Sequence, residues 1–391
     1  MNNILFITTF KVSSTKGGTE KTTITVASEL KSTYSYNCYS AYFIDEKSRK
    51  EECFDDEFLI RYDCFENDIS QIVLDKNIDV IIIQGEFEFA PKIRKLFPTI
   101  KIIFAHHFEP GWEENFITRR GLLLNIVRRK SFKTIVGNIL KILVFPYYHY
   151  EQCSELHAKY RCAYEKSDRV VLLVNEYIED YVKYGNISGR DKFRIIPNGL
   201  SFDFSLPEEK IYNKKHKALI VSRLEERQKR VFTALDIWNS IDFKSDWKLF
   251  IVGDGPDKKR YEKYVENHKI AGVVFTGRKN PLSEYKESAV FIMTSQSEGW
   301  GITLTEAQQM GVVPIAFDTC APIHEIIRDG ENGKLVNEGK VDEYSAELEK
   351  LMHNSDYRIK LAKNAIISTA RYSKKSVGKM WNDVICELTS K

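Results

Sequence analysis

Short apolar runs alternate with polar segments of helical period along the first half of this chain. Strands of the buried type are predicted at 4–9, 40–44, 58–62, 80–84, 100–105 and 168–174. Helices are predicted between them, at 20–30, 69–76, 91–96, 150–165 and 176–184. Because strand and helix alternate, the pattern predicts a parallel sheet and a Rossmann-like α/β domain over residues 1–204.

The second half repeats this pattern after a polar, charged stretch at 205–217 that contains Pro207 and is predicted to be the interdomain linker. Strands are predicted at 218–221, 247–252, 273–277, 289–293 and 312–318, which indicates a second Rossmann-like domain over 205–370. Helical period continues through the tail with a break near Tyr372 and Ser373, so residues 371–391 are expected to form a separate last helix.

Composition narrows the class of protein. A chain of 391 residues with 43% hydrophobic residues is long enough for two cores, and a net charge of +3 does not favour nucleic acid. The seven cysteines are scattered, with no C-x-x-C pair or zinc spacing, which predicts reduced thiols in a cytoplasmic protein. The N-terminus does not resemble a signal peptide, and no apolar run reaches the roughly 18 residues of a membrane span.

A glycine turn between the strand at 289–293 and the next helix carries the strongest chemical signal. Gly299 and Gly301 flank Trp300, and the helix expected to begin near Ile302 and Thr303 would direct backbone N–H groups at an anion. Glu298 lies at the turn, and Glu306 lies about one helical turn into the helix on the same side.

Other strand ends carry cations and glycines. Arg223, Lys229 and Arg230 follow the strand at 218–221, Gly253 follows the next strand, and Arg278 follows the one after that. Fixed positive charge at a strand end suits the charge that develops on a departing diphosphate.

Together these motifs resemble the donor site of the retaining GT-B glycosyltransferases, most closely family GT4, and the resemblance is strongest over 195–336. It implies two Rossmann-like domains facing each other across a cleft, with a C-terminal helix that crosses back to the first domain and is anchored by Trp381. It implies that Glu298 holds sugar hydroxyls, that Glu306 holds the ribose, and that Arg223 and Lys229 hold the diphosphate. The common family spacing places the lysine at Gln228, so Lys229 and Arg230 both remain candidates.

Three motifs in the first half extend the resemblance. Gly17 and Gly18 resemble the family's first glycine loop, His107 resembles the histidine near the transferred sugar and acceptor, and Asn198 stands in an Ile-Pro-Asn-Gly string that ends the first domain at the cleft. The segment 16–23 also resembles the deviant Walker A loop of ParA-like ATPases. Glu20, however, replaces that loop's last glycine and would oppose a phosphate.

Residues 115–150 contain no acidic side chain but seven basic ones, at positions 119, 120, 128, 129, 130, 133 and 141, among apolar runs. This mixture fits amphipathic helices on an anionic membrane surface. It equally fits a solvated basic face over a domain core, and a nucleic-acid contact is a third alternative.

The predicted function is retaining transfer of a sugar from a UDP- or GDP-linked donor to a glycan or lipid-linked glycan in cell-surface polysaccharide synthesis. The resemblance implies no cofactor and no metal, because Arg223, Lys229 and the helix start near Gly301 would stabilise the leaving group. Two alternatives are a ParA-like ATPase, which would need Lys21, and a catalytically silent sugar-nucleotide-binding protein.

Overall fold

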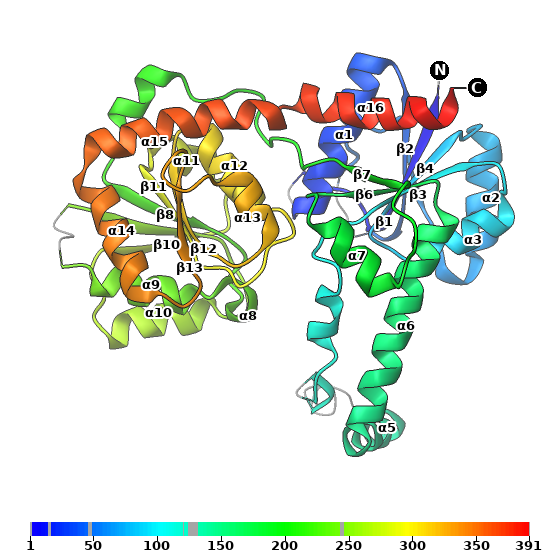
Figure 1. Ribbon diagram of the computed structural model, residues 1–391, viewed down its shortest axis with the longest axis horizontal. Coiled ribbons are helices and arrows are strands. Elements are labelled where there is room, and N and C mark those ends of the chain that lie inside the picture. The colour runs from blue at the N-terminus through cyan, green and yellow to red at the C-terminus, as the bar shows by residue number, and fades with distance from the viewer. Residues whose placement is uncertain are drawn as a thin grey trace. The chain divides into compact units, whose positions relative to one another are not determined.

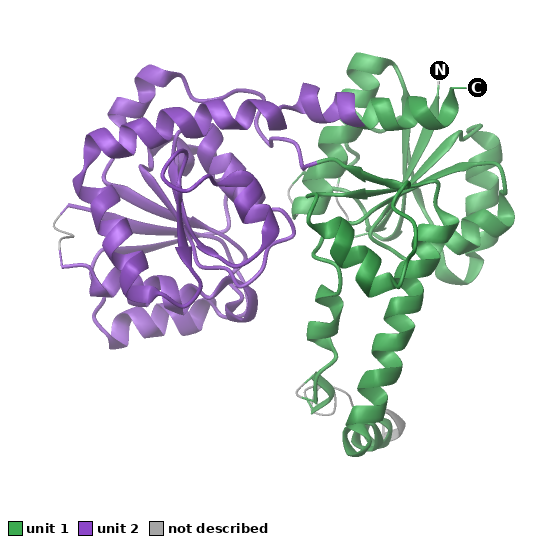
Figure 2. Cartoon of the chain, in the orientation of Figure 1, with its two compact units in different colours: residues 1–196, 381–391 green, residues 197–380 purple. Residues whose placement is uncertain are grey.

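The computed structural model describes residues 2–14, 17–45, 49–119, 121–123, 132–242 and 246–390 (Figure 1). The chain forms two compact units, one made of residues 1–196 with 381–391 and the other of residues 197–380 (Figure 2).

Unit 1 is built on a seven-stranded parallel sheet in the order β3-β2-β1-β4-β5-β6-β7. Its strands are β1 (Asn3–Phe10), β2 (Asn37–Ile44), β3 (Asp56–Leu59), β4 (Val80–Gln84), β5 (Lys101–Ala105), β6 (Arg169–Leu172) and β7 (Phe193–Ile195). The central strands β1, β4 and β5 are buried on both faces. This burial explains why they read in the sequence as continuous apolar runs.

The helices of unit 1 connect these strands. They are α1 (Gly18–Tyr34), α2 (Phe65–Asp75), α3 (Phe89–Leu96), α5 (Phe132–Leu143), α6 (Phe145–Lys166) and α7 (Tyr177–Gly185), with short 3-10 turns at Tyr62–Cys64 and Trp112–Phe116. The alternation predicted from the sequence is confirmed, although α6 begins at Phe145, five residues before the predicted start. Pro146 stands in its first turn, where a missing N–H group breaks no helical hydrogen bond.

Unit 2 repeats the design with a six-stranded parallel sheet in the order β10-β9-β8-β11-β12-β13. Its strands are β8 (Lys217–Val221), β9 (Lys248–Val252), β10 (Val273–Gly277), β11 (Val290–Met293), β12 (Val313–Asp318) and β13 (Lys334–Asn337). Its helices are α8 (Glu226–Lys229), α9 (Val231–Ser240), α10 (Lys258–Asn267), α11 (Leu282–Glu287), α12 (Ile302–Gln309), α13 (Ala321–Ile326), α14 (Val341–His353) and α15 (Ser355–Ser368), with 3-10 turns at Glu208–Asn213 and Thr369–Tyr372.

The boundary between the units lies at residue 196 rather than at the predicted residue 204. The polar segment 205–217 is no linker, because Leu206 and Ile211 are buried in unit 2 and the N–H of Leu206 donates to the carbonyl of Gln309. Two buried apolar residues and the bonds of Lys214 and Lys217 to unit 2 dock this segment, and the average polarity of the segment does not reveal them.

The last helix, α16 (Lys374–Thr389), begins in unit 2 and ends in unit 1, so the second boundary lies at residue 380 rather than 370. Within unit 1, Tyr36 Oη donates to Asn382 Oδ1 over 2.7 Å, and Glu387 pairs with Arg169 and Arg194. Trp381 is buried. The predicted return of the last helix to the first domain is therefore confirmed.

Among the described helices, none combines the length and apolar character needed to cross a bilayer.

Candidate functional site

The carboxyl ends of the parallel strands in unit 2 lie at one edge of its sheet, where open α/β sheets bind ligands. The loops after β8 and β11, neighbours in the sheet, carry the residues that the sequence singled out. These loops bond to each other directly. The N–H of Gln296 donates to the carbonyl of Gln228 over 2.7 Å, and Thr294 Oγ1 donates to the carbonyls of Lys229 and Arg230.

At the centre of this edge, Lys229 and Glu298 form an ion pair. Lys229 Nζ lies 2.7 Å from Glu298 Oε1, and the two side chains are only 15% and 11% exposed. Lys229 ends α8, and Glu298 lies in the glycine turn before α12. The pair places a cation and a carboxylate at one point of the sheet edge.

The competing cation, Arg230, is held elsewhere. Its guanidinium pairs with Glu338 after β13 at 2.6 Å, and its backbone adopts a left-handed conformation with φ of 47°. Arg223 pairs with Glu225 at 3.2 Å and has 70% of its side chain exposed. The structure therefore brings Lys229 rather than Arg230 to Glu298, while the phosphate-binding roles of Lys229 and Arg223 stay predictions.

The turn between Glu298 and α12 is stabilised by its glycine and its aromatic ring. Gly301 caps the helix with φ of 93°, a conformation that favours glycine. Trp300 is buried and packs edge-on against Tyr372 with ring centres 5.2 Å apart. The helix starts at Ile302, as predicted, so Ile302 and Thr303 carry the N–H groups of its first turn.

The glycines after β9 serve the packing of the chain itself. A Cβ on Gly253, whose φ is 150°, would lie 1.9 Å from the carbonyl oxygen of Ser222, and one on Gly255 would lie 2.4 Å from that of Leu224. The loop after β8 comes so close that both positions require glycine. This requirement is separate from the approach of a nucleotide that the sequence predicts.

Glu306 lies deeper than Glu298. It is 1% exposed, and its Oε2 accepts a hydrogen bond from Tyr285 Oη over 3.0 Å. Burial, and then the Glu306 carboxylate, raise the pKa of the Tyr285 phenol well above its usual value, so the phenol stays a donor. The ribose contact predicted for Glu306 would therefore share this carboxylate with Tyr285, a residue that the sequence analysis missed.

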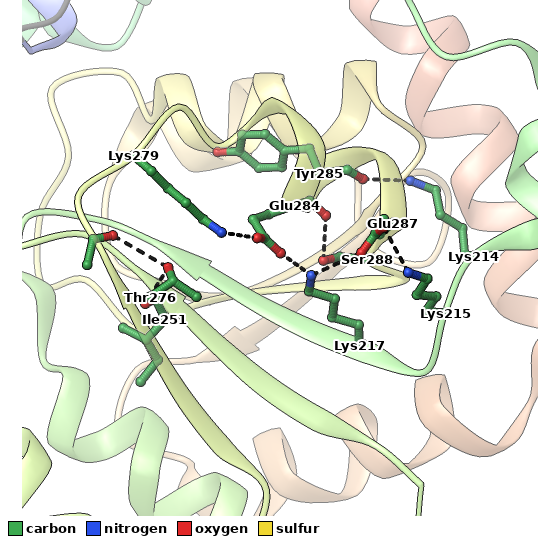
Figure 3. A network of polar contacts seen from close by, with 11 residues as sticks. Lys214, Lys215, Lys217, Ile251, Thr276, Lys279, Glu284, Tyr285, Glu287 and Ser288 are labelled. Atoms are coloured by element: carbon green, nitrogen blue, oxygen red, sulfur yellow. Dashed lines mark hydrogen bonds and ion pairs between the residues drawn. The ribbon is translucent and has the colours of Figure 1, made fainter.

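Helix α11, which supplies Tyr285, is held by a network of lysines (Figure 3). Lys217 on β8 bonds Glu284 and lies 3.4 Å from Glu287, and Lys279 bonds Glu284 from the loop after β10. Burial alone would raise the pKa of Glu284, but the two ammonium groups lower it below its ordinary value. A charged Glu284 thus ties α11 to β8 and to the loop that carries Arg278.

Lys214 supports the same helix from its carboxyl end. Its Nζ donates to the carbonyl of Tyr285 in the last turn of α11 over 2.7 Å (Figure 3). It also donates to the carbonyl of Met310, the residue that caps α12, over 2.6 Å. Burial lowers the pKa of Lys214 to about 7, and its amine group can donate to these carbonyls whether or not it is charged. Lys214 therefore joins the two helices that supply Tyr285 and Glu306.

In unit 1, the two histidines after β5 differ sharply in their surroundings. His106 packs among the rings of Phe87, Phe104, Tyr160 and Tyr181, and its Nε2 lies 3.3 Å from Tyr160 Oη. Burial, and then the neighbouring His107, lower its pKa to about 3. His106 is therefore a core residue.

His107 is bound through Nε2 to Gln84 Oε1 at the end of β4, and burial lowers its pKa to about 4. Gln84 was also missed from the sequence. The sequence does contain a sign of its role, because Gln84 is the one polar residue in the run 80–84 and ends it. That run forms β4, which pairs with β5, the strand that precedes His107.

The remaining predicted residues are spread over both units. Gly17 caps α1 and Gly18 begins it, both exposed, in unit 1; the neighbouring Lys16 lies outside the described residues. Asn198 is buried near the start of unit 2, and Arg278 is exposed after β10. Residues 120 and 124–131 of the basic segment also lie outside the described part of the chain.

A cavity of about 520 Å³ opens beyond β12 and β13, lined by Asp318, His324, Arg328, Asp329 and Glu343 among others. None of the residues predicted to bind the donor lines it. In the part of the chain that the structure describes, no group of three or more His, Cys, Asp or Glu side chains could hold a metal ion.

Comparison with known proteins gives this site its context. Residues 201–367 match the family model of the glycosyl transferases group 1. The amylovoran biosynthesis glycosyltransferase AmsD of Erwinia amylovora is 34% identical over 174 residues, which are 44% of this chain and 48% of that protein. The poly(glycerol-phosphate) alpha-glucosyltransferase of Bacillus subtilis is 24% identical over 217 residues, 55% of this chain and 32% of that protein.

The chain thus spans half or less of the length of these curated relatives. Over its whole length it resembles the crystal structure of HepE from Anabaena in complex with UDP and glucose, with a TM-score of 0.73, 14% identity and coverage of 99% of this chain and 100% of that one. Such similarity shows a shared fold, the GT-B fold with its two Rossmann-like domains. Residues 201–367 are therefore similar in sequence to the group 1 glycosyltransferases, and the whole chain shares its fold with HepE.

Proposed function

We propose that this protein is a retaining glycosyltransferase that moves a sugar from a nucleoside diphosphate sugar to a hydroxyl group of a glycan or lipid-linked glycan. The names of its relatives support this proposal, since one acts in amylovoran biosynthesis and another is an alpha-glucosyltransferase. HepE, which shares the fold, binds UDP and glucose in its crystal structure.

The observation that carries the proposal is the Lys229–Glu298 pair beside the start of α12. Breaking the bond between the sugar and the diphosphate leaves negative charge on the leaving phosphate. Lys229, Arg223 and the N–H groups of the first turn of α12 can stabilise this charge without a metal ion. Glu298 can accept hydrogen bonds from sugar hydroxyls, which fixes the sugar against the leaving group.

Binding of the donor is tested by thermal denaturation with a panel of UDP- and GDP-linked sugars. One class should stabilise the protein by about 2.7 kcal/mol at 100 times its dissociation constant, because a ligand that binds only the folded state shifts unfolding by mass action. No shift with any member of the panel would contradict the proposal.

Catalysis is tested with two variants side by side. Glu298→Ala should abolish both sugar transfer and the enzyme's slow hydrolysis of the donor. Lys21→Ala in the first βα loop should leave both activities intact. Loss of an ATPase activity with Lys21→Ala would favour the ParA-like alternative. Donor binding with neither transfer nor hydrolysis would favour a silent binding protein.

We further propose that residues 115–150 bind an anionic membrane surface that carries the acceptor. In Figure 1, α5 and the start of α6 project from the rest of unit 1. Apolar side chains on these two helices face solvent, among them Leu140, Leu143, Tyr147 and Tyr150. Exposed apolar rings and chains in an acid-free, basic segment match the apolar and electrostatic components of interfacial binding.

Sedimentation with phosphatidylglycerol vesicles at low salt tests this surface. The protein should co-sediment, and Leu143→Glu should weaken co-sedimentation because it places a negative charge in the interface. Leu74→Glu is the matched control, since Leu74 is a similarly exposed leucine on α2 of the same unit. Equal loss in both variants, or no binding by the natural protein, would contradict the membrane proposal.

A further inference from the structure

A second cavity in unit 2, of about 190 Å³, opens at the edge of the sheet opposite to the Lys229–Glu298 pair. Among its lining residues, His216 and Ala289 directly precede β8 and β11, and Gly311 lies two residues before β12. In a parallel sheet these amino-terminal strand ends share one edge, and the carboxyl ends share the other. The donor site proposed above therefore does not account for this cavity.

The residues that line the cavity include three basic side chains and no acidic one. The basic residues are Lys214, His216 and Arg358. Arg358 is 9% exposed, and Lys214 is partly buried. Within the described part of the chain, neither Lys214 nor Arg358 forms an ion pair with a carboxylate, although buried cations in proteins usually do. The cavity is therefore an electropositive one.

Backbone carbonyls hold both cations, and they leave some N–H groups unused. Lys214 Nζ donates to two carbonyls, over 2.7 and 2.6 Å, so its ammonium form has a third hydrogen without an acceptor among the described residues. Arg358 donates to the carbonyls of Leu351 and Met352 through Nη1 alone, over 2.6 and 3.1 Å. Its Nε and Nη2 are not among the fully enclosed polar atoms that have no partner, so a ligand can reach them.

The pKa values of the two cations agree with this picture. Burial lowers the pKa of Lys214 to about 7 and that of Arg358 below its ordinary value, whereas a nearby carboxylate would raise both. Carboxylates on neighbouring segments pair with other cations, namely Glu287 with Lys215 and Lys217, Glu208 with Lys363, and Asp246 with His216. A bound anion would therefore be the first full negative charge beside Lys214.

The start of α15 adds further donors to the same cavity. Ser355 is the first residue of this 14-residue helix, and it lines the cavity together with Arg358, which lies about one turn later. N–H groups in a first turn have no acceptor within the helix, and the helix dipole favours negative charge beside them. A helix start, a guanidinium group and an ammonium group are three kinds of donor with which proteins bind phosphate.

We propose that this cavity is a second ligand site of unit 2, which binds the phosphate group of a small phosphate monoester through Lys214, Arg358 and the start of α15. The cavity is smaller than the roughly 300 Å³ at which pockets for larger organic ligands begin, which favours a monoester over a nucleotide sugar. Apolar side chains such as Ile359 and Ala362 also line it and suit a short carbon chain on the phosphate. The site does not depend on the proposed sugar transfer.

Calorimetric titration of the protein with ethyl phosphate at pH 7 and low salt tests the site. The natural protein should bind ethyl phosphate, and Ser355→Asp should weaken binding by about tenfold, because a carboxylate at the cavity repels the anion. Ser355→Asp should still fold, since an acidic residue in a first turn favours the helix. Ser376→Asp is the matched control, because Ser376 lies in the first turn of α16 in the same unit and does not line the cavity. No binding by the natural protein, or equal weakening in both variants, would overturn the proposal.

A donor site for a diphosphate would attract the same anion, so the titrations are repeated in a Lys229→Gln background. The affinity of the cavity should be unchanged there, and Ser355→Asp should weaken it as before. Binding that is lost in Lys229→Gln and kept in Ser355→Asp would place ethyl phosphate at the opposite edge of the sheet and refute the proposal.

The titration of Lys214 provides a reading at the site itself. NMR on protein labelled with ¹³C-lysine follows the Cε signal of Lys214, which is assigned by its loss in Lys214→Met. The midpoint should lie near pH 7 in the ligand-free protein. Saturating ethyl phosphate should raise it by about one pH unit, because a bound anion favours the charged ammonium group. An unchanged midpoint in the saturated protein would show that the anion binds elsewhere.

Discussion

The Lys229–Glu298 ion pair leads to a prediction about the affinity of the protein for a nucleoside diphosphate that carries no sugar. In the ligand-free site, the cation proposed to bind phosphate is already neutralised by a carboxylate 2.7 Å away. Glu298→Gln keeps the shape of this side chain and removes its charge. We therefore expect Glu298→Gln to bind UDP or GDP more tightly than the natural protein, while it transfers sugar more slowly.

The magnitude follows from the geometry. A phosphate oxygen that bonds the far side of Lys229 Nζ would lie about 5 Å from Glu298, where two unit charges repel by about 3 kcal/mol at an effective dielectric constant of about 20. The two side chains are 11% and 15% exposed, so solvent screens part of this repulsion. Relief of about 1.4–2.8 kcal/mol corresponds to binding that is about ten to a hundred times tighter.

Calorimetric titration of UDP and GDP into the natural protein, Glu298→Gln and Lys229→Gln provides the measurement. Lys229→Gln should weaken binding, since it removes the cation and leaves Glu298 to repel the diphosphate. The rate of transfer should fall by about 10²–10³ in Glu298→Gln, the usual loss when a group that contacts the reacting sugar is removed. Glu331→Gln controls for the change in net charge, because Glu331 forms an exposed pair with Arg328 in the same unit.

Weaker binding of the diphosphate to Glu298→Gln would refute the reasoning. It would mean that Glu298 organises the empty site for phosphate instead of competing for Lys229. Equal tightening in Glu331→Gln would assign the effect to long-range charge rather than to the ion pair.

Two further predictions concern the two units separately. In unit 1, burial lowers the pKa of His107 to about 4 and that of His106 to about 3, so both rings bind protons more readily in the unfolded chain. The stability they contribute is fully present above about pH 6.5 and is lost towards pH 4 and pH 3, by up to about 1.4 kcal/mol per pH unit for each ring. Urea midpoints measured from pH 7 to pH 4 should fall less steeply in His106→Gln, and an unchanged slope would contradict the burial of this ring. In unit 2, Gly253→Ala should lower the melting temperature and weaken nucleotide binding, because its Cβ would collide with the carbonyl of Ser222. Gly137→Ala on α5 has open space and should leave both unchanged or raise stability by up to about 1 kcal/mol, so similar behaviour of the two variants would refute the steric argument.

The pattern of apolar positions was sufficient to predict the class of fold. Strands such as β4 and β12 are covered on both faces, so each appears in the sequence as an uninterrupted apolar run between helices. The glycine turn before α12 could also be predicted from the sequence, because a helix start with Gly301 at positive φ depends on neighbouring residues only. Local conformation and burial both determine which residue type stands at each position, so the periodic pattern of apolar positions predicts both.

Only the tertiary structure decided which residues meet. It paired Lys229 with Glu298, 69 positions away, and directed Arg230 to Glu338, although the two cations are adjacent in the sequence. It enclosed His106 in aromatic rings and placed Gln84 on His107, although both histidines follow the same strand. Such contacts depend on strand order and on the angle at which each loop leaves its strand. Neither the strand order nor the loop angle produces a periodic pattern in the sequence, because the partners come from distant parts of the chain.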